Sequence, residues 1–171
     1  MFDPVRICTI LNEEAVDYIV VGGFAAVVHG SSLPTRDIDL VPSRTPANLD
    51  RLARALKRMN AMIRTAGDPV SAQLDGPFLA NMPLMLKLMT DLGELDLTFA
   101  PSGGLGGFDE WDIEAIVVEI ADGLSVRVAS LNDIIDSKRA ANRPKDQMAL
   151  PYLESLRDQL DSYPARPAAD L

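Results

Sequence analysis

Two short segments of the sequence alternate acidic and apolar residues, and this alternation constrains the fold more than any other feature. The segments are RDIDLV at 36–41 and ELDLTF at 94–99. On a β-strand, successive side chains point to opposite faces of the sheet. Asp37 and Asp39 therefore share one face of the first predicted strand, and Asp96 lies on the polar face of the second. If the two strands are neighbours, the three carboxylates converge.

A cluster of three carboxylates has two interpretations. Hard divalent cations prefer oxygen ligands on rigid elements, and two ions about 3.5–4 Å apart need bridging carboxylates. Carboxylates that are packed together repel one another, so a genuine cluster predicts a bound cation. The alternative is structural: Asp37 caps a strand, Asp39 lies at an edge and Asp96 is solvated. The two strand patterns alone do not decide between these interpretations.

A glycine pair precedes the first acidic strand. YIVVGG predicts a short buried strand that ends in Gly22-Gly23, and FAAVVHG predicts a short helix directly after it. Backbone amides at the start of a helix bind phosphate, and glycine lets the phosphate approach closely. Most isolated glycine pairs are ordinary turns. Together with Asp37 and Asp39, however, the pair supplies both the phosphate site and the metal ligands that a metal–nucleotide complex requires.

Hydrophobic periodicity elsewhere predicts a fold with both helices and strands. Four of the strands form two hairpins, with tight turns at Leu92-Gly93 and Asp122-Gly123, and residues 61–83 are expected to be irregular or weakly stranded. The predicted fold class is α/β (α+β), a mixed β-sheet core flanked by helices with a helical C-terminal part. The expected helices cover residues 4–16 and 24–30, a stretch with Leu49, Leu52, Ala53 and Leu56 on one face, and two segments that begin near Ser130 and Arg143.

Composition and charge restrict the class of protein. The 171 residues are 47% hydrophobic, and no apolar run approaches the roughly 20 residues that span a bilayer. The acidic N-terminus does not resemble a signal peptide, so we expect a cytoplasmic protein with no membrane partner. The single cysteine, Cys8, permits no internal disulfide. A formal net charge of −9 disfavours long contacts with a nucleic-acid backbone.

One local basic patch, KRAANRPK at 138–145, runs against the acidic composition. Leu131, Ile134 and Ile135 mark the buried stripe of the helix that precedes it, and Lys138 is the next position on that stripe. A lysine at such a position either extends to solvent from the edge of the core or contacts a buried anion. We interpret Lys138 as a nucleotide contact.

Three further cations are candidate nucleotide contacts. Arg143 and Lys145 lie in the same patch, although cations there also suit the end of a helix, where they interact with its dipole. Arg36 stands directly before Asp37 and can reach a triphosphate bound beside it. Asp146, which follows a proline in a first helical turn, is interpreted as structural.

The segment VVGGFAAVVHGSSLPTRDIDLV resembles the signature of the polymerase-β-like nucleotidyltransferase superfamily, and within it the small bacterial branch that includes AbiEii-type abortive-infection toxins. ELDLTF resembles the strand that carries the third carboxylate of the family. LNDIIDSKRAANRPKDQMALPYLESL is similar to the C-terminal Lys-x4-Arg-x-Lys-Asp segment of that branch. The resemblance covers about residues 18–160 and is loose over 60–90. One departure is Gly23, where many members carry serine.

The resemblance implies roles for the candidate residues. Asp37 and Asp39 would ligate Mg²⁺ (or Mn²⁺), and Asp96 would complete the site and act as the base. Gly22 and Gly23 would hold the phosphates of a nucleoside triphosphate (NTP). An acceptor hydroxyl would attack the α-phosphorus in line and release pyrophosphate. The further nucleotide contacts are Arg36, Lys138, Arg143 and Lys145.

The acceptor stays open at this stage. An RNA end such as that of tRNA, a partner protein and a small molecule are all compatible with the sequence, and a toxin or antitoxin partner is implied by the AbiEii resemblance. The alternative is a catalytically silent nucleotide-binding or toxin–antitoxin interaction module with the same fold. We divide the chain into a nucleotidyltransferase core over 1–129, a C-terminal helical segment over 130–161 that packs on the core, and a disordered tail over 162–171.

Overall fold

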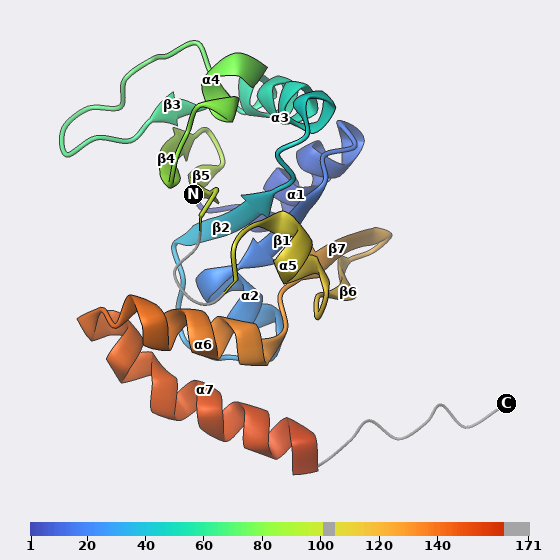
Figure 1. Ribbon diagram of the computed structural model, residues 1–171, viewed down its shortest axis with the longest axis vertical. Helices are drawn as coiled ribbons and strands as arrows, with labels where there is room; N and C mark the ends of the chain where they lie inside the picture. The colour runs from blue at the N-terminus through green and yellow to red at the C-terminus, as the bar shows by residue number, and fades with distance from the viewer. Residues whose placement is uncertain (101–104, 163–171) are drawn as a thin grey trace, which may run out of the picture.

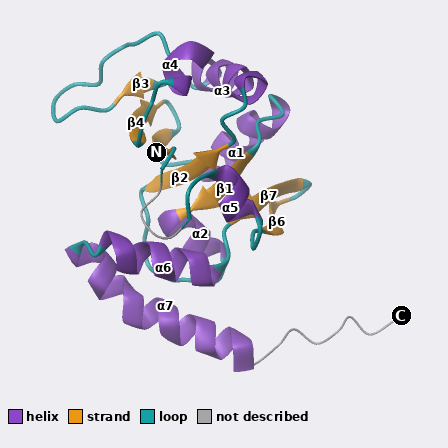
Figure 2. Ribbon diagram, viewed as in Figure 1, coloured by secondary structure: helices purple, strands orange, loops and turns teal. Residues whose placement is uncertain are grey.

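A seven-stranded mixed sheet lies at the centre of the computed structural model, which describes residues 1–100 and 105–162. The strands follow the order β3-β4-β5-β2-β1-β7-β6 across the sheet, and helices flank them (Figures 1 and 2). The strands are β1 Tyr18–Val21, β2 Asp37–Pro42, β3 Met62–Ile63, β4 Met85–Thr90, β5 Gly93–Thr98, β6 Ile116–Ala121 and β7 Leu124–Val128. The helices are α1 Pro4–Glu13, α2 Gly22–Val28, α3 Pro46–Arg58, α4 Gly76–Ala80, α5 Phe108–Asp112, α6 Leu131–Ala141 and α7 Pro144–Ser162.

The predicted fold class is confirmed, and most elements lie where the sequence places them. Both predicted hairpins form, since β4 pairs antiparallel with β5 and β6 with β7. Three regions differ. Helix α2 begins at Gly22, so both glycines belong to its first turn, and the region 61–83 contains β3 and α4. Helix α5, Phe108–Asp112, forms where no helix was expected. The tail predicted to be disordered lies, apart from its first residue, outside the described residues.

The central pair of strands is β2 and β5, which run parallel and are direct neighbours. In their register Asp37 lies opposite Glu94, and Asp39 lies opposite Asp96. The residues on the other face are fully buried at 0% exposure, namely Ile38, Leu40, Leu95 and Leu97. The condition that the sequence left open is therefore met, because the two acidic strands are adjacent and in register.

The C-terminal helices α6 and α7 pack against each other, and α6 also contacts α2 (Figure 1). Ser130 caps α6 as predicted, since its hydroxyl accepts a hydrogen bond from the backbone amide of Asp133 (3.1 Å) and lies 2.8 Å from the Asp133 carboxylate. Leu131, Ile134 and Ile135 form the buried stripe of α6. Within the described part of the chain, no helix is long and apolar enough to cross a membrane.

Asn48, on α3, is a fully buried polar residue that joins the ends of two central strands. Its amide donates to the carbonyl oxygens of Asp17 (2.9 Å) and Ser43 (2.8 Å), and its carbonyl accepts from the Asp17 amide (2.7 Å). Asp17 directly precedes β1 and Ser43 directly follows β2. One side chain thus satisfies three backbone groups where α3 meets the sheet.

We expect Asn48→Ala to lower the free energy of unfolding by about 2–4 kcal/mol, because three backbone groups lose their partner and the buried site of the amide is left empty. The matched control is Asn81→Ala, since Asn81 is exposed and its amide donates only to the Pro77 carbonyl in the turn before it. Urea unfolding of the two variants measures the difference. Equal stabilities of the two variants would contradict the role of Asn48.

Candidate active site

The predicted carboxylate cluster forms on the polar face of β2 and β5. Asp37, Asp39 and Asp96 each offer a carboxylate oxygen, and these oxygens lie within 4.8 Å of one another. Asp96 is the most buried of the three, at 4% exposure, while the other two are half-buried. Oxygen atoms at this spacing on two paired strands fit a hard divalent cation.

The electrostatics of the cluster call for a cation. Burial raises the pKa of Asp39 to about 6, and the charges of Asp37 and Asp96 add to the shift. Burial also raises the pKa of Asp96, against the opposing charges of Arg64 and Lys87. Both shifts mean that the negative charge of the cluster is incompletely compensated by the protein. A divalent ion would supply the missing charge.

Gly22 brings the backbone into direct contact with the cluster. Its φ of +68° lies in the left-handed region, and a Cβ at this position would come within 2.1 Å of Asp39 Oδ2. Any side chain at position 22 would therefore be strained and would displace the Asp39 carboxylate. Position 22 therefore has to be glycine, because Asp39, a predicted metal ligand, occupies the space that a side chain would need.

Gly23 makes room for Thr35 instead. A Cβ at position 23 would lie 2.7 Å from Thr35 Oγ1, and that hydroxyl is 3.1 Å from both the carbonyl oxygen and Oδ1 of Asp37. A serine at position 23 would collide with Thr35 unless Thr35 moved. A glycine at position 23 therefore has a steric reason, and the hydroxyl beside Asp37 comes from Thr35.

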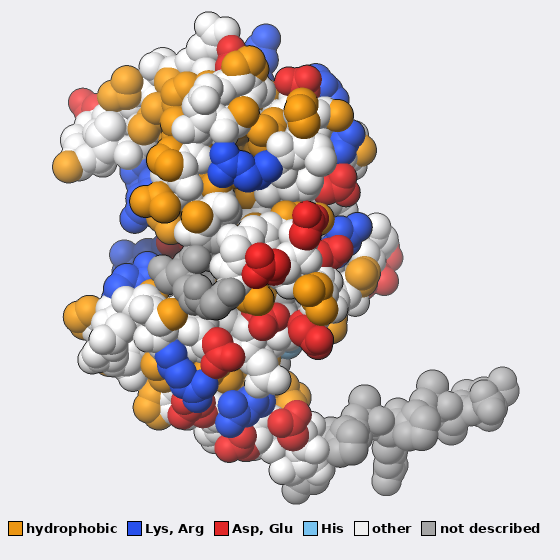
Figure 3. Space-filling model, viewed as in Figure 1, with side chains coloured by type: hydrophobic (Ala, Val, Ile, Leu, Met, Phe, Trp, Pro, Cys, Tyr) orange, Lys and Arg blue, Asp and Glu red, His pale blue; other side chains and the backbone are white. Residues whose placement is uncertain are grey.

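A cavity of about 670 Å³ opens over the carboxylates, and it is large enough for a nucleotide. All nine residues predicted to form the site line this cavity: Gly22, Gly23, Arg36, Asp37, Asp39, Asp96, Lys138, Arg143 and Lys145. Figure 3 shows Lys and Arg side chains on both rims of an indentation at the left edge of the molecule. The sequence therefore predicted which residues lie together around this cavity.

Asp146 is the buried anion that Lys138 contacts. Its carboxylate is 0% exposed and lies 3.3 Å from Lys138 Nζ and 2.6 Å from Arg143 Nε. The residue interpreted as structural thus holds two of the candidate phosphate contacts against the wall of the cavity. Lys145, its neighbour in the chain, is exposed and also lines the cavity.

Two cations on the opposite side of the cluster were missed. Arg64, directly after β3, donates from Nη2 to both carboxylate oxygens of Asp96 (2.8 and 3.1 Å) and pairs with Glu94. Lys87, on β4, lies directly across from Asp96 in the antiparallel register. Lys87 could have been found from the predicted hairpin, whereas no sequence pattern marks Arg64.

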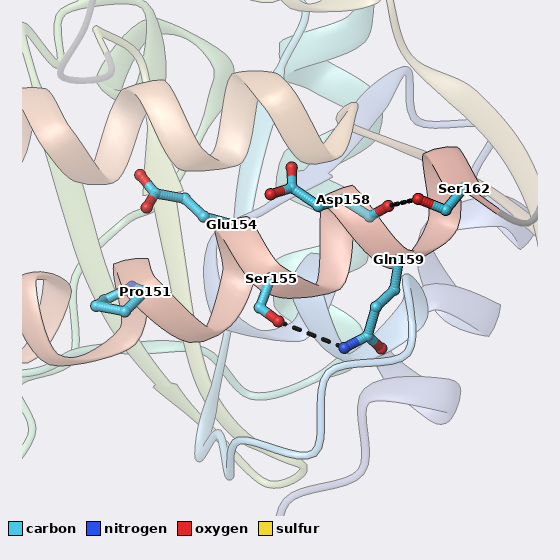
Figure 4. Close-up of a pocket in the computed structure, with 6 residues that line it drawn as sticks. All are labelled: Pro151, Glu154, Ser155, Asp158, Gln159 and Ser162. Carbon is cyan, nitrogen blue, oxygen red and sulfur yellow. Dashed lines mark hydrogen bonds between the residues drawn. The ribbon is translucent and has the colours of Figure 1, made fainter.

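A separate hollow lies along α7 (Figure 4). It is lined by residues of this one helix, and two of its hydrogen bonds are local, from Ser162 to the Asp158 carbonyl (2.7 Å) and from Gln159 to Ser155 (3.4 Å). It contains no Lys or Arg. The carboxylate cavity is therefore the stronger candidate for the functional site.

Comparisons with solved structures agree with the predicted fold. No family model matches the sequence, and a search of curated proteins found no match. Among solved structures, the chain is similar to the lincosamide antibiotic adenylyltransferase LnuA with lincomycin bound (TM-score 0.60, 16% identity, 90% of this chain and 95% of that one). It is also similar to ANT(2")-Ia in complex with adenylyl-2"-tobramycin (TM-score 0.55, 18% identity, covering 95% of this chain and 88% of that one).

A third similar structure is a putative nucleotidyltransferase from Thermotoga maritima (TM-score 0.50, 15% identity, 95% of this chain and 96% of that one). The matches extend over nearly the whole length of each chain. At these identities they establish the fold, which is the one that nucleotidyltransferases adopt.

We expect Asp146→Asn to lower the free energy of unfolding at pH 7 by about 2–3 kcal/mol. This is less than the roughly 3–5 kcal/mol of a fully buried ion pair, because Arg143 is half exposed. The matched control is Asp136→Asn, because Asp136 forms an exposed (i, i+3) pair with Arg139 on α6 and should contribute at most about 0.5 kcal/mol.

The effect of Asp146→Asn should depend on pH. Burial alone would raise the pKa of Asp146, but its bonds to Arg143 and Lys138 outweigh burial and hold the pKa below the usual 3.8. The carboxylate therefore stabilises the protein fully above pH 3.8, and this contribution is lost as the pH falls through the lower pKa of the folded state. Urea unfolding should show the gap between wild type and variant narrowing in acid, and a constant gap would contradict the assignment.

Proposed function

We propose that this protein is a metal-dependent nucleotidyltransferase that moves a nucleoside monophosphate from an NTP to an acceptor hydroxyl. The observation that carries the proposal is the placement of three carboxylates within 4.8 Å of one another in a cavity that Lys138, Arg143 and Lys145 also line. A metal-bound triphosphate needs both parts: carboxylates for the cation and cations for the phosphates.

Asp37, Asp39 and Asp96 are the residues that would hold Mg²⁺ or Mn²⁺. Their oxygen donors suit either ion, and the raised pKa of Asp39 reflects a site that favours added positive charge. When bound, the ion would neutralise charge that develops on the transferring phosphate. Arg64 keeps Asp96 oriented through two hydrogen bonds.

The other lining residues bind and position the triphosphate. Lys138 and Arg143 line the cavity and are already held by ion pairs with Asp146. Their side chains therefore lose little conformational freedom when phosphate binds. Gly22 and Gly23 allow close approach of the phosphates to the backbone. Asp96, the buried member of the cluster, would take the proton from the attacking hydroxyl. In this proposal, residues 1–129 carry the carboxylates and the glycine pair, and residues 130–161 carry the cations Lys138, Arg143 and Lys145.

The acceptor hydroxyl belongs to an RNA end, a partner protein or a small molecule in this proposal. The similar structures include a lincosamide antibiotic adenylyltransferase and a protein in complex with adenylyl-2"-tobramycin, which supports small-molecule acceptors. The sequence resemblance to AbiEii-type proteins supports a role in a toxin–antitoxin or phage-defence system, with a toxin or antitoxin as partner.

A second candidate function is nucleotide binding without transfer, and Arg64 favours it. An arginine that donates to both oxygens of Asp96 competes with a proton or a metal for that carboxylate. Incubation with Mg²⁺ and each α-labelled NTP in cell lysate distinguishes the two candidates. Any labelled RNA, protein or small molecule that depends on Asp39 excludes the silent module.

We expect Mg²⁺ with the preferred NTP to raise the melting temperature of the wild-type protein by about 5–10 °C at a hundredfold excess over the dissociation constant. Asp39→Asn should abolish this shift and any transfer, because the cation site loses a charged ligand. The same variant should melt at a slightly higher temperature than wild type without ligand, because it removes repulsion within the cluster.

The matched control is Asp161→Asn, which removes an exposed carboxylate near the end of α7. This variant should keep the wild-type shift with Mg²⁺ and NTP. Absence of a shift with all four NTPs in the wild type, or an equal shift in Asp39→Asn, would contradict the proposed function.

A further inference from the structure

Lys and Arg side chains that lack a carboxylate partner gather at the cavity. Of the fifteen Lys and Arg residues in the described part of the chain, nine form ion pairs. Three of the remaining six line the cavity over the carboxylates: Arg36, Lys87 and Lys145. In a protein with a net charge of −9, cations find carboxylate partners easily, so this concentration of unpaired cations marks a surface that receives anions.

These cations lie on two opposite sides of the carboxylates. Lys145 belongs to α7 and lies beside the cluster of Lys138 and Arg143 around Asp146. Lys87 belongs to β4, which is separated from β2 by β5 in the sheet order. The indentation in Figure 3 has Lys and Arg side chains on both of its rims. One triphosphate at the α6–α7 side therefore leaves the cation on the β4 side unused.

The geometry of phosphoryl transfer assigns the β4 side to the acceptor. In an in-line displacement, the attacking oxygen and the leaving oxygen lie on opposite sides of the phosphorus. If pyrophosphate departs toward Gly22 and Lys138, the acceptor hydroxyl approaches from the side of Asp96 and β4. On that side the cavity is lined by Met85, Lys87 and Glu94.

The acceptor side presents Lys87 as a cation that forms no ion pair among the described residues. Arg64 pairs with Glu94 and donates hydrogen bonds to Asp96. Asp96, the residue directly across the strands from Lys87, is thus already bonded to another cation. A polycationic acceptor would be repelled at this position, whereas a phosphate group would be attracted.

We infer that the acceptor is a phosphate-bearing molecule and that Lys87 contacts its phosphate beside the reacting hydroxyl. This inference rests on the proposed nucleotidyltransferase function and adds the chemical class of the acceptor. A single phosphate contact also agrees with the acidic composition, which disfavours a long nucleic-acid track but not one terminal nucleotide. The phosphate belongs either to an RNA 3′ end or to a small phosphorylated sugar, and the probes below separate these sources.

The test measures binding in the presence of Mg²⁺ and a non-transferable α,β-methylene analogue of the NTP that gives the largest thermal shift. Three probes are compared: a dye-labelled RNA pentanucleotide with a free 3′ hydroxyl, ribose 5-phosphate and the polyamine tobramycin. We expect a phosphate-bearing probe to bind and tobramycin to bind weakly or not at all. Binding of RNA alone identifies a nucleic-acid end, and binding of ribose 5-phosphate identifies a small phosphorylated acceptor.

Lys87→Gln should weaken binding of the phosphate-bearing probe about fivefold. The slope of log binding constant against log salt concentration should become shallower by about 1, because one phosphate contact is lost. The thermal shift with the nucleotide analogue should stay as in wild type, because Lys87 lies away from the α6–α7 cations. The matched control is Lys57→Gln, since Lys57 is an exposed, unpaired lysine on α3 outside this cavity, and it should leave all binding unchanged.

Several results would overturn the inference: tight binding of tobramycin alone, no binding of either phosphate-bearing probe, or equal binding by wild type and Lys87→Gln. If the nucleotide analogue binds and any one of these results is seen, the inferred acceptor class is wrong and the proposed function stands. If the analogue itself gives no thermal shift, the proposed function fails and the inference fails with it.

Discussion

The parallel register of β2 and β5 is the constraint on which the site depends. Asp39 lies opposite Asp96 only because these two strands are direct neighbours in this register. A slip of one residue would turn Asp96 toward the buried face and expose Leu95 to the cavity. The apolar faces of both strands are fully buried, so such a slip would cost several kcal/mol of apolar burial. Core packing thus fixes the geometry of the carboxylates.

The polar face of the two strands, in contrast, reduces stability, because three partly buried carboxylates repel one another. At the cavity wall, Asp146 pairs with both Lys138 and Arg143 and holds them in place. An arrangement that is unfavourable without a ligand and consistent with a bound cation is typical of a functional site.

Much of this site could be predicted from the sequence, for identifiable reasons. Asp37, Asp39 and Asp96 follow from strand alternation, and Lys138 follows from the buried stripe of α6. Lys87 was missed although the predicted turn at Leu92-Gly93 sets a register that places it opposite Asp96. Arg64 could not be predicted, because β3 has only two residues and its pairing depends on tertiary contacts. The contact between Gly23 and Thr35 depends likewise on how the loop before β2 folds back.

The central claim is that the acidic faces of β2 and β5 form a cation site that works with a nucleotide. The most direct measurement is anomalous diffraction from crystals grown with Mn²⁺ and a non-transferable NTP analogue. The account predicts an anomalous peak about 2.1 Å from carboxylate oxygens of Asp37 and Asp39, with the triphosphate between that peak and Lys138. Nucleotide density elsewhere on the protein, or no anomalous peak at the three carboxylates, would contradict the account.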